Sequence, residues 1–214
     1  YTITIAESCT GGLLASTLTD IAGASKWFNQ SWVTYSYDAK IRELNVDPKT
    51  LEKRGAVSAE VAIQMAQGAL ARANADIAIS ITGIAGPNND GTKKKVGFVY
   101  VGIASRTWAI AEATQIGGNR QENKQGFVHF ALLTAIRHWD QAMELAEQTL
   151  KNEIIQREEQ ARLKALEEIE RNKRAAAAAQ SAEWQSQSWS GDSADNSESN
   201  LGTDVEWSSD SANE

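Results

Sequence analysis

The sequence predicts a layered α/β/α domain with a mixed sheet, followed by a long charged helix and a disordered acidic tail. Over residues 1–142, segments with strand patterning alternate with segments of helical spacing, as in α/β proteins. Two strand-like segments meet at a tight turn, Ser105-Arg106, which adds an antiparallel pair to the sheet. The composition then changes twice, so we expect a domain at 1–142, a helix at 143–180 and a tail at 181–214.

The order of elements follows from hydrophobic patterning and helix-capping signals. Alternating or continuous apolar runs rich in β-formers predict strands at residues 2–6, 31–36, 76–81, 96–104 and 107–114. Apolar spacings of three and four, with capping residues, predict helices at 13–21, 38–44, after Asp47-Pro48, after Ser58 and from about Arg120. The run at 76–81 is almost wholly apolar, which is typical of a strand buried on both faces.

Residues 143–180 differ from the domain because charges of both signs alternate along them. Acid-first i,i+4 pairs, which stabilise isolated helices, recur at Glu153/Arg157, Glu158/Arg162, Glu167/Arg171 and Glu170/Arg174. An apolar seam at heptad positions begins at Leu150 and Ile154 but stops at Arg157. We therefore expect a solvated single helix, with a coiled coil as the alternative.

The bulk composition limits the compartment and the partners. The net charge is −7, yet residues 181–214 hold eight acids and no base, so the rest carries +1 and shows no nucleic-acid footprint. No apolar run reaches the ~20 residues of a membrane span. The single cysteine excludes an internal disulfide and fits a reducing compartment. We expect a cytoplasmic protein whose start at Tyr1 is clipped, with neither nucleic-acid nor membrane partners.

The stretch IAESCTGG places Ser8, Cys9 and Thr10 on one strand-to-helix turn, followed by Gly11 and Gly12. One interpretation is a capped helix start, with Thr10 as the cap and the glycines permitting close packing. The other is a reactive centre, in which free amides of the turn bind an oxyanion or a phosphate. The residues of the turn alone leave both interpretations open.

The search for a base that could activate a serine leads to lysine. The two histidines, His129 and His138, are nine positions apart on one helix and therefore lie on opposite faces. Lys40 falls in the first turn of a helix, where the macrodipole and partial burial both lower a lysine pKa. Tyr35 is close enough in sequence to assist a proton transfer. The alternative is a surface Lys40 and a core Tyr35.

A second glycine loop, Gly83-Ile84-Ala85-Gly86-Pro87, follows the buried strand at 76–81. Ligands of open α/β sheets bind at the carboxyl ends of strands, so this loop is a candidate binding loop. It is also compatible with a plain turn.

The motifs AESCTGG, VTYSYDAK, GAVS and ISITGIAGP, in this order and spacing, closely resemble the CinA C-terminal domain family over about residues 1–140. The resemblance implies an amidohydrolase that converts nicotinamide mononucleotide to nicotinate mononucleotide and ammonia, without a metal or cofactor, and a homo-oligomer. It implies Ser8 as nucleophile rather than Cys9, with Lys40 and Tyr35 as catalytic partners. The residues expected to bind substrate are Thr10, Gly11, Gly12, Gly83, Ala85, Gly86 and Arg120.

Departures from the family pattern support a second hypothesis, a catalytically silent CinA-like module that serves in docking. The family's TYSN reads TYSY here, with Tyr37 beside the expected site, and its GDR reads Gly118-Asn119-Arg120. The charged helix and the tail are foreign to the family. Because tryptophan is enriched in binding hot spots, Trp184, Trp189 and Trp207 suggest a peptide ligand for a basic, groove-bearing protein partner. The alternative is a passive solubilising tail.

Overall fold

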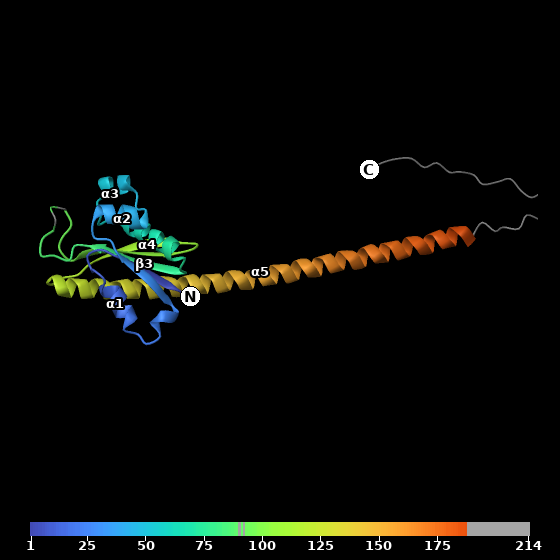
Figure 1. The fold of residues 1–214 in the computed structure, drawn as a ribbon. Helices are drawn as coiled ribbons and strands as arrows, with labels where there is room; N and C mark the ends of the chain where they lie inside the picture. The colour runs from blue at the N-terminus through green and yellow to red at the C-terminus, as the bar shows by residue number, and fades with distance from the viewer. Residues whose placement is uncertain (90, 92, 188–214) are drawn as a thin grey trace, which may run out of the picture. The chain divides into compact units, whose positions relative to one another are not determined.

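The structure of the protein, a computed structural model, describes residues 1–89, 91 and 93–187 (Figure 1). Contacts along the chain group it into two units, Tyr1–Thr149 and Leu150–Glu214. The boundaries expected from the sequence, at residues 142 and 180, remain predictions.

The first unit is built on one five-stranded mixed sheet. Its strands are β1 (Ile3–Glu7), β2 (Phe28–Val33), β3 (Ile77–Gly83), β4 (Phe98–Ser105) and β5 (Ala109–Gln115). They are ordered β2-β1-β3-β4-β5. β1 pairs in parallel with β2 and β3, whereas β4 is antiparallel to both β3 and β5. The predicted mixed sheet is thereby confirmed.

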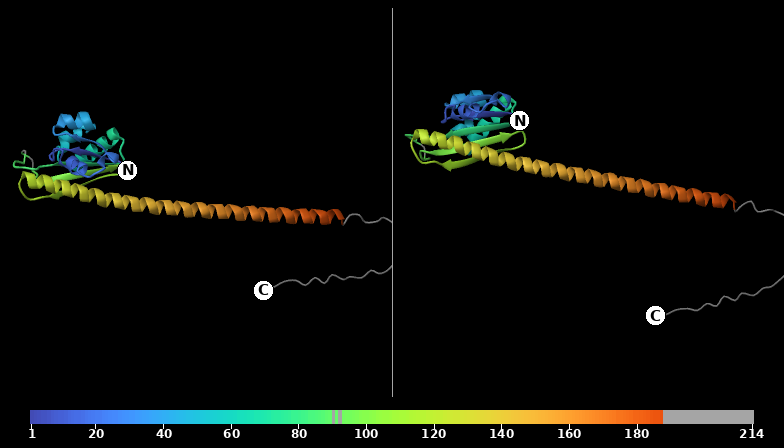
Figure 2. Two further views of the ribbon diagram at one scale, coloured as in Figure 1. Left: turned by 60° about the horizontal axis from the view of Figure 1, so that its bottom comes forward. Right: turned by 90° about the horizontal axis from the view of Figure 1, so that it is seen from below.

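Helices cover both faces of this sheet (Figure 1, Figure 2). One face packs against α1 (Leu13–Thr19) and the first turns of α5 (Arg120–Gln187) through a core that includes Ile5, Leu14 and Phe127. The other face packs against α2 (Tyr37–Leu44), α3 (Pro48–Arg54) and α4 (Ala59–Ala73). A short 3₁₀ turn, η1 (Ala24–Lys26), precedes β2. The molecule therefore has the three layers expected of an α/β/α fold.

The helix starts on the second face follow the capping signals in the sequence. Ser36, Asp47 and Ser58 each accept a hydrogen bond from a backbone amide of the helix that follows, α2, α3 and α4 respectively. Gly68 allows α4 to approach α2 closely, because a Cβ at this position would lie 1.9 Å from the carbonyl oxygen of Leu44. Capping and close packing together fix α2, which carries Lys40.

Each predicted strand is shifted at one or both ends, and two of the boundary differences have a visible cause. β2 begins at Phe28 rather than Ser31, because its parallel ladder with β1 starts at the pair Ile3–Phe28. α1 ends at Thr19, where the amide of the following residue, Asp20, bonds back to the carbonyls of Ser16 and Leu18. Cross-strand pairing and a tight helix end therefore overrule the local hydrophobic pattern.

The second unit continues α5 as far as Gln187. Of the four expected i,i+4 pairs, Glu170–Arg174 forms at 3.7 Å, while Arg171 pairs with Glu168 instead. Trp184 lies on the helix and is 78% exposed. Trp189 and Trp207, with the rest of the predicted tail from residue 188, lie outside the described residues. In the part of the chain that the structure describes, no helix has the length and hydropathy to cross a bilayer.

Candidate active site

Ser8 lies directly beyond the end of β1, on the turn that leads into α1. Its amide donates to the carbonyl of Ile81 at 3.0 Å, and its own carbonyl accepts from the amide of Gly11 at 3.1 Å. Gly11 and Gly12 have φ angles of +64° and +94°, a region that favours glycine. The two glycines therefore allow the chain to reverse tightly and hold Ser8 at the edge of the sheet.

Lys40 reaches this turn from α2, 32 residues along the chain. Its Nζ donates to Ser8 Oγ at 3.0 Å and to the carbonyl oxygen of Thr34 at 2.6 Å. The Lys40 side chain has no exposed surface, and Ser8 is 8% exposed. The structure thus brings together the two residues that the sequence singled out as nucleophile and base.

The environment of Lys40 favours its neutral form. Burial lowers the pKa of Lys40 from its ordinary value of 10.5 to about 8, and the charge of a Cys9 thiolate would oppose this shift. A lysine with such a pKa is partly neutral near pH 7 and can accept a proton from a hydroxyl. The pair Lys40–Ser8 therefore has the contact and the electrostatics of a serine nucleophile with a lysine base.

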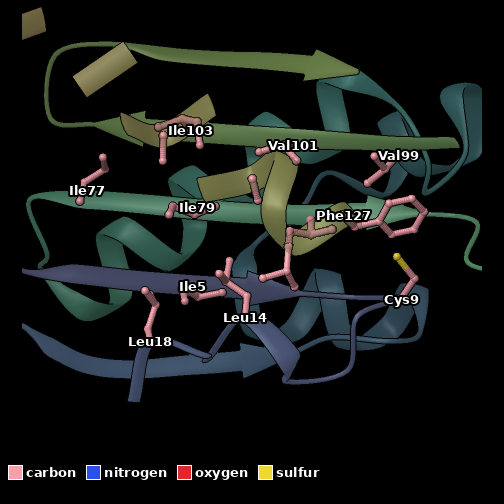
Figure 3. Close-up of a cluster of buried hydrophobic side chains, with 14 of the residues drawn as sticks. Ile5, Cys9, Leu14, Leu18, Ile77, Ile79, Val99, Val101, Ile103 and Phe127 are labelled. Atoms are coloured by element: carbon pink, nitrogen blue, oxygen red, sulfur yellow. The ribbon is translucent and has the colours of Figure 1, made fainter. Parts of the chain in front are cut away.

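Cys9 points away from this chemistry and into the core. Figure 3 shows its sulfur beside Phe127 at one end of the apolar cluster, and the residue is 6% exposed. Burial raises the pKa of the Cys9 thiol to about 11, although backbone amides and the charges of Lys40 and Arg120 act in the opposite direction. Since the thiolate is the reactive form, Cys9 is the weaker candidate for the nucleophile.

Tyr35 and Arg120 meet each other at the surface of the site. The Tyr35 hydroxyl accepts a hydrogen bond from Arg120 Nη2 at 2.9 Å, and Arg120 Nη1 donates to the carbonyl of Gly86 at 2.5 Å. Tyr35 is 59% exposed. Within residues 1–89, 91 and 93–187, no hydrogen bond joins Tyr35 to Ser8 or Lys40, so its place in a proton transfer remains a prediction.

The second glycine loop is tied to the start of α5. Asn123 Nδ2 donates to the carbonyl oxygens of Ala85 and Gly118 at 3.1 and 3.0 Å. Gly83 ends β3 against β4, where a Cβ would lie 2.7 Å from the carbonyl of Phe98. Together with the bond from Arg120 to Gly86, these contacts place the loop and Arg120 side by side.

Glu7, which sequence reasoning missed, holds the start of α1 next to the candidate site. Its carboxylate, which has no exposed surface, accepts hydrogen bonds from the amides of Gly12, Leu14 and Ala15 at 3.0, 3.2 and 2.8 Å. Glu7 rather than Thr10 therefore caps α1, and the interpretation of Thr10 as the cap is wrong. The local sequence pattern gives no signal for this contact, because it depends on the chain reversal at the left-handed Gly12.

Other groups considered from the sequence lie elsewhere in the fold. His138 on α5 bonds to Glu112 on β5, and His129 is exposed. Tyr37, expected beside the site, accepts a hydrogen bond from the amide of Ala56 at 3.2 Å. Among the residues with described positions, no three His, Cys, Asp or Glu side chains gather so that they could hold a metal ion.

The first unit is therefore a three-layered α/β domain that holds a buried serine–lysine pair at the end of a strand. Residues 1–138 match the model of the CinA C-terminal domain, and the chain belongs to this family. The resemblance inferred from the motifs is confirmed.

Named relatives agree with this assignment. A nicotinamide-nucleotide amidohydrolase, PncC, of Enterobacter agglomerans is 46% identical over 138 residues, which cover 64% of this chain and 84% of that protein. A CinA-like protein of Chlorobium limicola is 51% identical over 138 residues, 62% of this chain but only 32% of the relative. The match thus spans about a third of the length of this longer relative.

Solved structures of the same superfamily share the fold. A CinA superfamily protein of Escherichia coli superposes with a TM-score of 0.59 at 37% identity, covering 62% of this chain and 77% of that one. A competence/damage inducible protein of Agrobacterium tumefaciens gives a TM-score of 0.60 at 41% identity, with coverages of 62% and 82%.

Proposed function

We propose that the chain hydrolyses the carboxamide of nicotinamide mononucleotide and releases nicotinate mononucleotide and ammonia. The observation that carries this proposal is the buried contact of 3.0 Å between Lys40 Nζ and Ser8 Oγ. It is supported by the 46% identical relative whose name is that of a nicotinamide-nucleotide amidohydrolase.

In this mechanism neutral Lys40 takes the hydroxyl proton of Ser8 while Ser8 Oγ attacks the carboxamide carbon. The tetrahedral intermediate collapses with breakage of the C–N bond, and Lys40 returns the proton to the departing ammonia. A water molecule, deprotonated by Lys40, then hydrolyses the ester on Ser8. The carboxylate product leaves, and Ser8 regains its proton.

The oxyanion of this intermediate needs hydrogen-bond donors near Ser8. The amides of Gly11 and Gly12 are engaged, one with the carbonyl of Ser8 and the other with the carboxylate of Glu7. We assign the oxyanion role to the amides of Cys9 and Thr10, which lie on the same turn. Gly11 and Gly12 contribute the shape of the turn.

The phosphate of the substrate is assigned to Arg120 and the loop Gly83–Gly86. Arg120 is oriented by Tyr35 and Gly86, and these two bonds are the ones it makes within the described residues, so other N–H groups of its five remain for a phosphate. Arg120→Ala is expected to raise KM for the mononucleotide and to change little for the riboside, which lacks phosphate. Equal losses for both substrates would remove Arg120 from the phosphate site.

The decisive experiment is ammonia release by the purified chain and three variants. Ser8→Ala and Lys40→Ala are expected to abolish release from nicotinamide mononucleotide, while Cys9→Ala retains most of it. An inactive Cys9→Ala beside an active Ser8→Ala would make Cys9 the nucleophile. No release by the unmodified chain would favour the silent docking module instead. A cytoplasmic location, a homo-oligomer and a protein partner for the tail are further proposals.

A further inference from the structure

A cavity of about 460 Å³, widely open to solvent, lies between the start of α1 and the first turns of α5. It is lined by Leu13, Arg120, Gln121, Lys124 and Gln125. Two of these side chains are cations, two are amides that donate hydrogen bonds, and none is a carboxylate. A cavity of this composition suits an anion.

Lys124 is the uncommitted cation of this cavity. In the described part of the chain, its ammonium group has neither a hydrogen bond nor an ion pair with another residue, and its side chain is half-buried. Arg120, by contrast, already bonds to Tyr35 and Gly86. The acid nearest in sequence, Glu122, accepts from the amide of Asn119.

The placement of the two cations costs free energy unless an anion is present. Arg120 and Lys124 are i,i+4 neighbours, where like charges repel by a few tenths of a kcal/mol, and both lie at the N-terminal end of α5, where the helix dipole disfavours cations. A bound dianion removes both penalties at once. The unpaired ammonium and the cavity therefore point to the same ligand chemistry.

Lys124 also lies against the turn that carries the nucleophile. Its Nζ is 3.8 Å from the position that a Cβ on Gly11 would take, and the amide of Gly11 bonds to the carbonyl of Ser8. An anion held by Lys124 is therefore adjacent to the candidate site. We propose that Lys124 is the second cation for the phosphate monoester of the substrate, beside Arg120; the identity of this substrate rests on the function proposed above.

The first test separates phosphate recognition from chemistry. Lys124→Met removes the charge but keeps the aliphatic stem, Lys124→Arg retains the charge, and Lys53→Met is the matched control on exposed α3. With nicotinamide mononucleotide, Lys124→Met is expected to raise KM about tenfold, the size of one lost charged hydrogen bond, with a smaller loss on the riboside. Lys124→Arg is expected to restore KM. Equal losses on the two substrates would overturn the proposal.

The second test uses inorganic phosphate and needs no catalytic activity. Phosphate is titrated into the full chain at constant ionic strength, set with chloride, while amide chemical shifts or the unfolding temperature are followed. Saturable binding by the unmodified chain and by Lys53→Met, lost in Lys124→Met, is the expected result. Identical titrations for Lys124→Met and Lys53→Met would overturn it.

The two tests fail separately. A chain that binds phosphate through Lys124 but releases no ammonia contradicts the proposed function and leaves the anion site standing. Loss of phosphate binding in Lys124→Met with an unchanged KM for the mononucleotide overturns the substrate role of Lys124.

Discussion

The hydroxyl of Tyr35 and the guanidinium of Arg120 are joined by a hydrogen bond of 2.9 Å, although 85 residues separate them in the sequence. Tyr35 follows β2, whereas Arg120 is the first residue of α5. Because Arg120 also bonds to Gly86, three segments of the chain converge on one cation. Tyr35 is therefore placed to orient Arg120.

Tyr35→Phe tests this relationship. Loss of the hydroxyl is expected to raise KM for the mononucleotide by roughly two- to tenfold, the size of one hydrogen bond, because Arg120 loses one of its two anchors. In an Arg120→Ala background the same change is expected to have no further effect, which a double-mutant cycle measures. A large fall in kcat that persists without Arg120 would instead place the hydroxyl in the proton transfer.

The pKa of Lys40 predicts the pH dependence of the reaction. Lys40 must be neutral to accept the proton of Ser8, and burial brings its pKa down to about 8. Below that pH the neutral fraction falls about tenfold per unit, so kcat/KM is expected to rise with pH up to about 8 and then level off. The measurement is a profile of kcat/KM against pH in the free enzyme.

Cys9→Ala provides the control for this profile. The pKa of the Cys9 thiol is raised to about 11, so the thiol is neutral throughout the range and its removal leaves the rising limb in place. If the rising limb disappears or moves by a full pH unit in Cys9→Ala, the titration depends on Cys9, and its assignment to Lys40 is wrong.

Glu7 predicts a coupling between stability and catalysis. Glu7→Ala deprives three amides at the start of α1 of their acceptor, and it is expected to lower the free energy of unfolding by at least about 2 kcal/mol. The same change loosens the turn that holds Ser8, so kcat also falls. Glu7→Gln keeps one acceptor oxygen, so it is expected to lower the free energy of unfolding and kcat by less than Glu7→Ala. Urea unfolding and ammonia release measure the two effects.

Glu52→Ala is the matched control for the loss of a carboxylate. Glu52 is exposed on α3, and its removal is expected to change stability by no more than about 0.5 kcal/mol. If Glu7→Ala lowers the free energy of unfolding by no more than Glu52→Ala does, the three hydrogen bonds of Glu7 do not stabilise the turn.

Local patterns in the sequence predict most of the helices and strands of the fold. The caps Ser36, Asp47 and Ser58 form as expected, because each depends only on residues within three positions. The pairing of Lys40 with Ser8 could also be proposed from the sequence. The scarcity of histidine left lysine as the candidate base, and strand ends gather at one edge of the sheet.

Contacts that depend on the three-dimensional course of the chain could not be predicted from the sequence. Glu7 caps α1 because Gly12, in a left-handed conformation, turns the helix start back over the end of β1. Asn123 reaches Ala85 across 38 residues. The local pattern of strand and helix residues indicates neither contact, since each depends on a chain reversal or a long-range docking.

The division of the chain after Thr149 yields the last prediction. Both apolar cores, the Ser8–Lys40 pair and Arg120 lie within residues 1–149. Beyond this point Leu150, Leu163 and Leu166 on α5 are at least half exposed, and exposed helical ion pairs contribute only about 0.3–0.5 kcal/mol each. A chain that stops after Thr149 is therefore expected to keep kcat/KM for the mononucleotide and the urea midpoint of the full chain. Loss of ammonia release or a midpoint lowered well beyond error would show that residues 150–214 support the domain.

If the truncated chain keeps its activity and stability, pull-downs with the truncated and the full-length chain test whether the tail recruits a partner protein. Recovery of the same partners by both chains would show that the tail binds none of them.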